Sequence, residues 1–90
     1  MSQNDDIEDR VPVYDATDLG RAIRRLRLAR GWTQTDLAEW LGVHRVTVAK
    51  MERGGAVDMP VVVRALALLG AMVTVHRRGV ELRSVSPSDA

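Results

Sequence analysis

The segment from Thr33 to Arg53 constrains the fold more than any other part of the chain. Its apolar residues keep a helical spacing of three to four on both sides of Gly42, and glycine ends helices because it readily adopts a left-handed backbone conformation. Thr33 is a helix-capping residue type, and Asp36 stands three positions later, as in a capping box. The segment therefore predicts two short helices joined by a sharp turn.

Two further helices are predicted on either side of this pair. Asp15 is expected to cap a helix over about residues 16–30, and Asp58 is expected to cap a helix that ends at Gly70. Each of these stretches repeats apolar residues at the spacing of one helical face. The sequence therefore predicts a mainly α fold, with a compact four-helix domain over residues 15–70.

The hydrophobic pattern changes after Gly70 from a helical period to alternation, which is typical of β-strands. Two alternating stretches flank Arg78 and Gly79, and a two-residue loop there would place Val75 opposite Leu82. Because Arg-Gly is a weaker turn signal than Asn-Gly, two arrangements stay open. The stretches form either a hairpin within one chain or a strand pair between subunits.

This β element is expected to dimerise the protein. A lone two-stranded hairpin is only marginally stable in water, so it needs either the helical body or a second copy of itself. The four-helix domain already supplies a complete core. We therefore assign residues 71–85 to dimerisation, through the apolar row formed by Val73, Val75 and Leu82.

Charge is unevenly distributed, although the formal net charge is only +1. Residues 1–18 carry six carboxylates against one arginine, whereas residues 19–53 carry eight basic side chains against three acidic ones. A middle segment this basic indicates a surface that faces a polyanion. For three of the arginines, taken alone, a solvated helix face is the favoured interpretation: Arg21, Arg24 and Arg25.

The chain ends are expected to be unstructured, with a flexible acidic arm over residues 1–14 and a disordered tail over residues 86–90. No cysteine is present, and His44 and His76 lack metal-ligand spacing. Since no nucleophile–base pair, carboxylate dyad or phosphate loop appears, we expect no catalytic residue, metal or cofactor. The absence of a signal peptide and of a long apolar run predicts a cytoplasmic protein with no membrane partner.

The second short helix of the segment carries side chains suited to reading DNA. In a helix-turn-helix the second helix enters the major groove while the first crosses the backbone. Arg45 can contact a guanine in bidentate fashion, and Val46 either contacts a thymine methyl or is an incidental surface valine. The remaining candidates are expected to contact phosphates or base edges: Thr33, Gln34, His44, Thr47, Lys50 and Arg53. For His44 the alternative that it makes no DNA contact stays open.

Several motifs, taken in order, resemble the Cro/repressor-type (XRE) helix-turn-helix family over residues 19–70. They are Arg24-x-x-Arg27, Gly31-Trp32-Thr33-Gln34-x-x-Leu37-Ala38-x-x-Leu41-Gly42-Val43, Val48-x-x-Met51-Glu52-Arg53-Gly54 and Leu66-x-x-Leu69-Gly70. The resemblance implies that Gln34 contacts phosphate at the groove edge. It also implies a structural ion pair between Arg27 and Glu52, so that neither side chain contacts DNA. The recognition face would then carry Arg45, Val46 and Lys50.

Within this family the layout is similar to that of the HipB antitoxins, in which a short C-terminal β element dimerises a compact helical domain. The matching stretches are Gly31-Trp32-Thr33-Gln34 and Leu68-Leu69-Gly70-Ala71-Met72-Val73-Thr74. The resemblance implies a homodimer that binds a palindromic operator, represses its own operon and neutralises a HipA-like serine/threonine kinase toxin. The alternatives are a stand-alone repressor and an interaction module that mainly holds a partner toxin.

Overall fold

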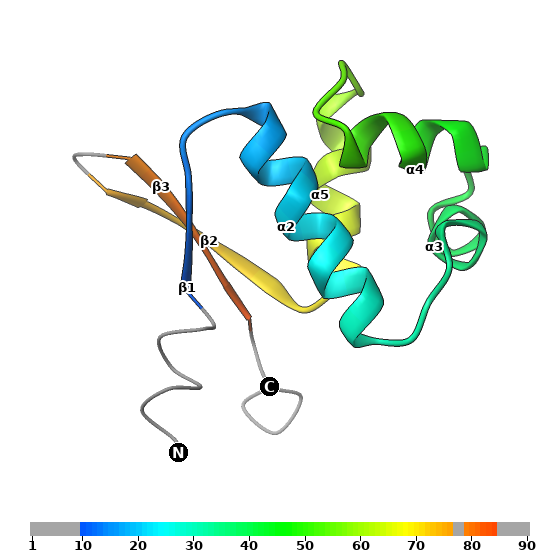
Figure 1. The fold of residues 1–90 in the computed structure, drawn as a ribbon, viewed down its shortest axis with the longest axis horizontal. Coiled ribbons are helices and arrows are strands. Elements are labelled where there is room, and N and C mark those ends of the chain that lie inside the picture. Colours follow the sequence, from blue (N-terminus) through cyan, green and yellow to red (C-terminus); the bar gives the residue numbers. More distant parts are fainter. Residues whose placement is uncertain (1–9, 77–78, 85–90) are drawn as a thin grey trace.

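The computed structural model describes residues 10–76 and 79–84, so residues 1–9 of the predicted arm and the predicted tail lie outside the described residues. The elements in chain order are β1 (Arg10–Val13), α2 (Ala16–Ala29), α3 (Gln34–Leu41), α4 (Arg45–Glu52), α5 (Met59–Leu68), β2 (Ala71–His76) and β3 (Gly79–Ser84). The sheet and the α3–α4 pair lie at opposite ends, with α2 and α5 between them (Figure 1). The expected mainly α fold with a C-terminal hairpin is confirmed.

The helices begin and end where the sequence predicts. The Asp15 carboxylate accepts a hydrogen bond from the backbone N–H of Asp18 at 2.8 Å, which caps α2. Thr33 and Asp36 form a complete capping box at the start of α3, with each side chain accepting from the other residue's backbone N–H. Gly42 ends α3 in the left-handed conformation, with φ of 71°. This geometry sets the sharp turn between α3 and α4.

The core lies where all four helices meet. Its largest fully buried side chains come from α2, α3 and α4: Ile23, Leu37, Leu41 and Val48. The α2 helix crosses α4 at very close range, because a Cβ added to Gly20 would lie 2.4 Å from the Met51 carbonyl oxygen. Only glycine permits this approach. The position of α4 relative to α2 therefore depends on backbone contact as well as on side-chain packing.

Strand β1 differs from the sequence-based prediction, which placed residues 10–13 in the flexible arm. It pairs antiparallel with β3, with Val11 opposite Leu82 and Val13 opposite Val80. Both valines are half-buried against the core. Pro12 is compatible with this strand because β1 lies at the edge of the sheet, which has the order β1-β3-β2. Two valines around one proline are too short a pattern to reveal the strand in advance.

The predicted hairpin register is also wrong, by two residues. Val75 lies opposite Val80, not opposite Leu82, and His76 lies opposite Gly79. Apolar alternation alone does not distinguish the predicted register from the observed one. A shift of two residues leaves each side chain on its predicted face. The question left open by the turn is answered, because β2 and β3 form a hairpin within one chain.

The role predicted for Leu82 is wrong in this fold. Its side chain is 2% exposed, so it belongs to the core of the single chain and is not surplus to it. With β1 in place β3 becomes the central strand, and this position packs Leu82 under the helices. Val73 and Val75 of β2 remain 45% and 76% exposed. Only these two residues of the predicted row are available to a partner.

Candidate nucleic-acid interface

The N-terminal ends of α3 and α4 meet at one corner of the molecule. Gln34 is the first residue of α3 and Arg45 is the first residue of α4. An Arg45 guanidinium nitrogen donates to the Gln34 side-chain oxygen at 3.1 Å. The turn at Gly42 and the half-buried Val43 bring these two positions together. The arrangement matches a helix-turn-helix, in which the first turn of the second helix enters the major groove.

One side of α4 is buried and the other faces solvent. Val48, Met51 and Glu52 point into the protein. Successive residues turn by about 100°, so the opposite side carries a continuous outer face. It is formed by four exposed residues and one half-buried alanine: Arg45, Val46, Lys50, Arg53 and Ala49.

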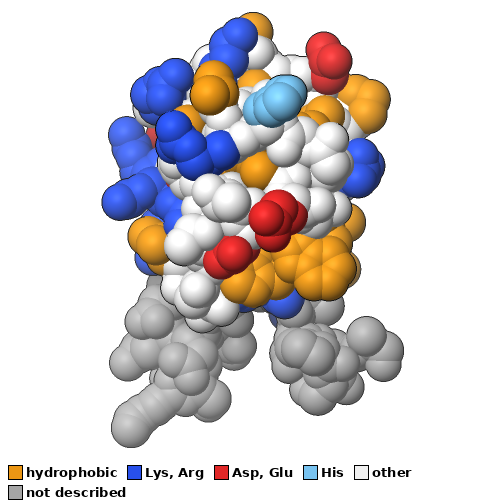
Figure 2. All heavy atoms as spheres, turned by 90° about the vertical axis from the view of Figure 1, so that its right-hand side faces the viewer, with side chains coloured by type: hydrophobic (Ala, Val, Ile, Leu, Met, Phe, Trp, Pro, Cys, Tyr) orange, Lys and Arg blue, Asp and Glu red, His pale blue; other side chains and the backbone are white. Residues whose placement is uncertain are grey.

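Basic side chains gather on the end of the molecule formed by α3 and α4. Figure 2 shows this face, where blue Lys and Arg side chains lie close together with a histidine beside them. The acidic side chains on the same view lie mostly away from this cluster. Such a separation of charge favours a polyanion over the basic part of the face.

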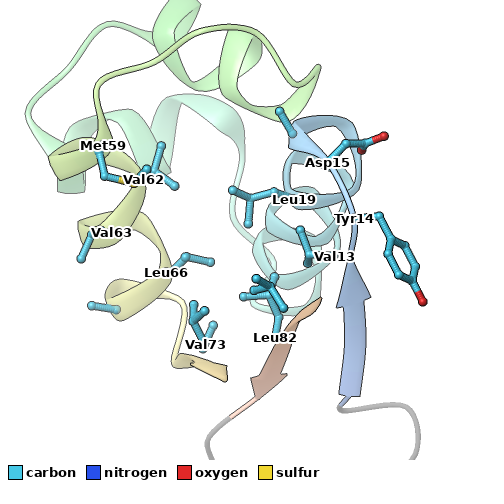
Figure 3. Close-up of a pocket in the computed structure, with 14 residues that line it drawn as sticks. Val13, Tyr14, Asp15, Leu19, Met59, Val62, Val63, Leu66, Val73 and Leu82 are labelled. Atoms are coloured by element: carbon cyan, nitrogen blue, oxygen red, sulfur yellow. The ribbon is translucent and has the colours of Figure 1, made fainter. Parts of the chain in front are cut away.

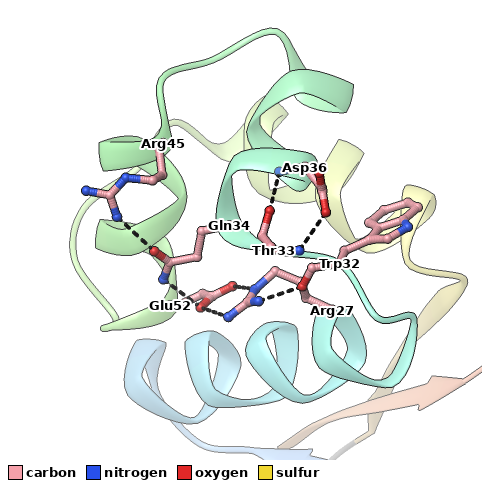
Figure 4. Close-up of polar contacts among 7 residues, drawn as sticks. All are labelled: Arg27, Trp32, Thr33, Gln34, Asp36, Arg45 and Glu52. Carbon is pink, nitrogen blue, oxygen red and sulfur yellow. Dashed lines mark hydrogen bonds and ion pairs between the residues drawn. The ribbon is translucent and has the colours of Figure 1, made fainter.

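A chain of polar contacts runs from the core to this corner (Figure 4). Arg27 donates to both carboxylate oxygens of Glu52, at 2.6 and 3.1 Å, and to the backbone carbonyl of Trp32 at 2.8 Å. Glu52 also accepts from the side-chain nitrogen of Gln34 at 3.1 Å. Gln34 in turn accepts from Arg45. The ion pair implied by the resemblance is present, and it is linked to the surface.

The other predicted DNA contacts are spread around this corner. The Thr33 side chain is exposed and already serves the capping box, and His44 is the exposed N-cap of α4 without a side-chain capping bond. Thr47 is half-buried, whereas Lys50 is exposed and lies against Gly55. Arg53 caps the far end of α4, roughly 12 Å along the helix axis from its first residue. The structure therefore groups most of the candidates with Arg45 at the N-terminal end of α4, whereas Lys50 lies in its last turn and Arg53 is its C-cap.

Sequence reasoning missed two features of this site. Ala49 lies within the outer face of α4, and its spacing of four from Arg45 could have placed it there. The link from Glu52 through Gln34 to Arg45 had no local signal, because it joins residues 18 and 11 positions apart. Among the described residues no group of three or more His, Cys, Asp or Glu side chains is placed to hold a metal ion. No helix in the same ranges is long and apolar enough to cross a membrane.

Comparison with known proteins identifies the type of domain. A family model described as a helix-turn-helix domain matches residues 18–79. The competence pilus inhibition repressor of Acinetobacter baylyi is 36% identical over 50 residues, which cover 56% of this chain and 46% of that protein. Antitoxin HipB of Escherichia coli K12 is 35% identical over 40 residues, which cover 44% of this chain and 46% of that protein. The matched segments thus span less than half of these relatives.

Two solved structures share the fold. A chain in the HipA-HipB-O2-O3 complex superimposes with a TM-score of 0.64 and 26% identity, covering 71% of this chain and 92% of that chain. A chain in a HipB-O1-O2 complex gives the same TM-score and identity and is covered to 94%. The named relatives are a repressor and antitoxins rather than enzymes. The HipB antitoxins are among the proteins to which this chain is similar. Because the family model matches more than half of its length, the chain belongs to the helix-turn-helix domain family.

Proposed function

We propose that this DNA-binding helix-turn-helix chain is a sequence-specific transcriptional repressor that binds a palindromic operator as a homodimer. The observation that carries the proposal is the exposed guanidinium of Arg45, held by Gln34 at the first turn of α4. That position enters the major groove in helix-turn-helix proteins. A repressor works on DNA, so the proposal also places the protein in the cytoplasm.

Each outer-face residue receives a role from its chemistry. Arg45 would read guanine, whose N7 and O6 match two guanidinium N–H groups, while the 64% exposed Val46 would pack on a thymine methyl. Thr47 would meet a base edge or a phosphate. The remaining candidates would contact phosphates, helped by the free backbone N–H groups at the start of α3: Thr33, Gln34, His44, Lys50 and Arg53.

The test is a selection from a random DNA pool followed by titration. The purified chain should enrich one palindromic sequence, because two copies related by a twofold axis read two equal half-sites. It should then bind the selected duplex far more tightly than a scrambled duplex, and both affinities should fall as salt rises. Equal affinity for both duplexes, or affinity independent of salt, would refute the proposal.

Dimerisation is proposed to use β2 and the apolar surface beside it. A groove of about 630 Å³ lies between the sheet, α5 and the start of α2 (Figure 3). Exposed apolar side chains surround it, including Tyr14, Met59, Val63 and Val73. Strand β2 is an edge of the sheet, and an edge strand is a template for pairing with a second chain. A second copy would bury both features at once.

The named relatives favour a second role as an antitoxin. Two of them are called antitoxin HipB, and one structural neighbour belongs to a complex of HipA with HipB. We therefore propose that the chain neutralises a HipA-like serine/threonine kinase. The test is co-expression with a kinase encoded beside this gene, where the chain should restore growth and co-purify with the kinase. A neighbourhood without such a kinase would favour a stand-alone repressor, as the likeness to the competence pilus inhibition repressor does.

A further inference from the structure

We infer that the acidic segment ahead of β1, residues 1–9, docks on two arginines of α2 and shields them from DNA. Neither group of charges has a task in the proposed function, whose contacts lie on or beside α3 and α4. The docking goes beyond that function, whereas the effect on DNA rests on it. The acidic segment carries four carboxylates and no basic side chain: Asp5, Asp6, Glu8 and Asp9.

The receiving surface is a groove of about 310 Å³ between β1 and α2. Strand β1 supplies an apolar wall, and Arg21 and Arg25 lie one turn apart on the α2 side. Arg21 has a distant acidic neighbour in Asp18, at 3.7 Å, and Arg25 forms no ion pair with a carboxylate of the described residues. Both arginines are exposed. The groove therefore presents positive charge that its own surroundings leave largely uncompensated.

The acidic segment is attached at the open end of this groove. At the other end the backbone N–H of Tyr14 donates to the Asp18 carboxylate at 3.0 Å. The chain turns there, so β1 and α2 run beside each other in opposite directions (Figure 1). Residues before Arg10 therefore leave beside the later turns of α2, which carry Arg25. An extended chain spans at most about 3.5 Å per residue, so the last two carboxylates of the segment lie within roughly 10 Å of Val11.

Charge complementarity selects this segment as the occupant of the groove. One exposed ion pair contributes little, but here four carboxylates meet two arginines on a short tether. Attachment to β1 keeps the segment at a high effective concentration, so individually weak contacts suffice. Such an attraction weakens as salt rises, which provides a direct test.

The docked segment would keep these arginines away from DNA. They lie about 100° and 140° around α2 from Gly20, which touches α4. A duplex that met them would do so without base reading by α4, and phosphate contacts alone carry no sequence information. Covering Arg21 and Arg25 therefore lowers non-specific affinity and leaves base reading by α4 in place.

A spin label reports the docking without DNA. The chain has no cysteine, so Ser2→Cys gives a single labelling site eight residues ahead of Arg10. The label should broaden the amide signals of residues 21–25 more than those of α4, and less at high salt. The broadening should also fall when the four carboxylates are replaced without shortening the chain, by Asp5→Asn, Asp6→Asn, Glu8→Gln and Asp9→Asn. Equal broadening with the charged and the neutral segment, or stronger broadening in α4, would overturn the inference.

Titration of a scrambled duplex tests the shielding. The neutral segment should raise the affinity roughly tenfold at low salt and steepen the salt slope by about 2, with a smaller change for the selected duplex. Arg21→Gln combined with Arg25→Gln should abolish this gain, because no arginine is then left to uncover. Arg24→Gln is the matched control, since it removes one charge of the same helix only about 40° from Gly20. It should keep the gain.

These backgrounds separate docking from a change in net charge. A gain of equal size in all of them would mean general repulsion between the segment and DNA, and the shielding role would then be wrong. The substituted arginines are exposed, so the variants are expected to fold, and the single substitutions replace the pair if it does not. A wild type that binds no DNA would overturn the proposed function and leave the spin-label result in force.

Discussion

Arg27 of α2 and Glu52 of α4 form a buried ion pair in which the shorter contact, from Nε to Oε2, is 2.6 Å. The pair joins two helices that also touch through their backbones at Gly20. Removing one partner would leave the other charge buried without its counter-ion. The desolvation cost of that charge then reappears as lost stability.

Glu52→Ala is therefore predicted to lower the free energy of unfolding by about 3–5 kcal/mol, measured by urea denaturation. Arg27→Met combined with Glu52→Leu should recover most of this loss, because neither charge is then buried. The exposed pair between Arg21 and Asp18, at 3.7 Å, is the matched control. Arg21→Ala should cost no more than about 1 kcal/mol. A similar cost for Arg21→Ala and Glu52→Ala would contradict this account.

Gly20→Ala is predicted to destabilise the protein by about 1–3 kcal/mol through overpacking. The added methyl would lie 2.4 and 2.7 Å from the carbonyl oxygens of Met51 and Glu52, so α2 and α4 would have to separate. Gly31→Ala is the comparison, because a Cβ added there would have nothing within 4 Å. Only the positive φ of 73° disfavours alanine at this position. Thermal unfolding of both variants checks the prediction. If Gly20→Ala left the thermal stability unchanged, α2 and α4 would lie farther apart at this position than described.

The helical part of the fold was predictable because its signals are local. The caps at Asp15 and Thr33, the left-handed glycine at Gly42 and the spacing of apolar residues each act within a few positions, and they hold in the structure. Asp58 stands at the start of α5 as predicted, but its side chain makes no capping bond. The same reasoning placed Arg45 and Val46 on an exposed turn, where they lie. Family resemblance added the pairing of Arg27 with Glu52, which no local pattern encodes.

The sheet was harder to predict because its pairings are not local. Strand β1 pairs with β3 although the two are about 70 residues apart in sequence, with Val11 opposite Leu82. No pattern near Val11 in the sequence indicates that pairing. Once β1 is present, β3 becomes the central strand and Leu82 joins the core. One missed strand thus accounts for the wrong role given to Leu82, whereas the hairpin register was missed because apolar alternation is the same in both registers.

Arg45→Ala and Lys50→Ala are predicted to weaken DNA binding in different ways. Arg45 would contact a base, so its loss should cost about 1–3 kcal/mol of discrimination at one base pair. Lys50 lies on the outer face of α4 and would meet phosphate, so its loss should weaken all duplexes similarly and reduce the salt slope by about 1. Titrations at several salt concentrations with the selected and scrambled duplexes separate the two effects. The assignments would be reversed if Lys50→Ala alone changed the sequence preference.

Val75→Asp and Leu82→Asp are predicted to differ although both residues lie on the same face of the hairpin. Val75 is 76% exposed, so a charge there should leave the single chain folded and prevent a second copy from covering the strand. Leu82 is 2% exposed, so a charge there should unfold the chain itself, because an unpaired buried carboxylate is strongly destabilising.

Sedimentation velocity and circular dichroism distinguish these outcomes. Val75→Asp should sediment as a folded monomer beside a dimeric wild type, whereas Leu82→Asp should lose its helical signal. Val63→Asp, at a 55% exposed position of α5 in the groove wall, tests whether the second copy also occupies the groove. If Val63→Asp stays dimeric while Val75→Asp does not, strand β2 alone forms the interface. If both stay dimeric, the contact between subunits lies elsewhere on the chain.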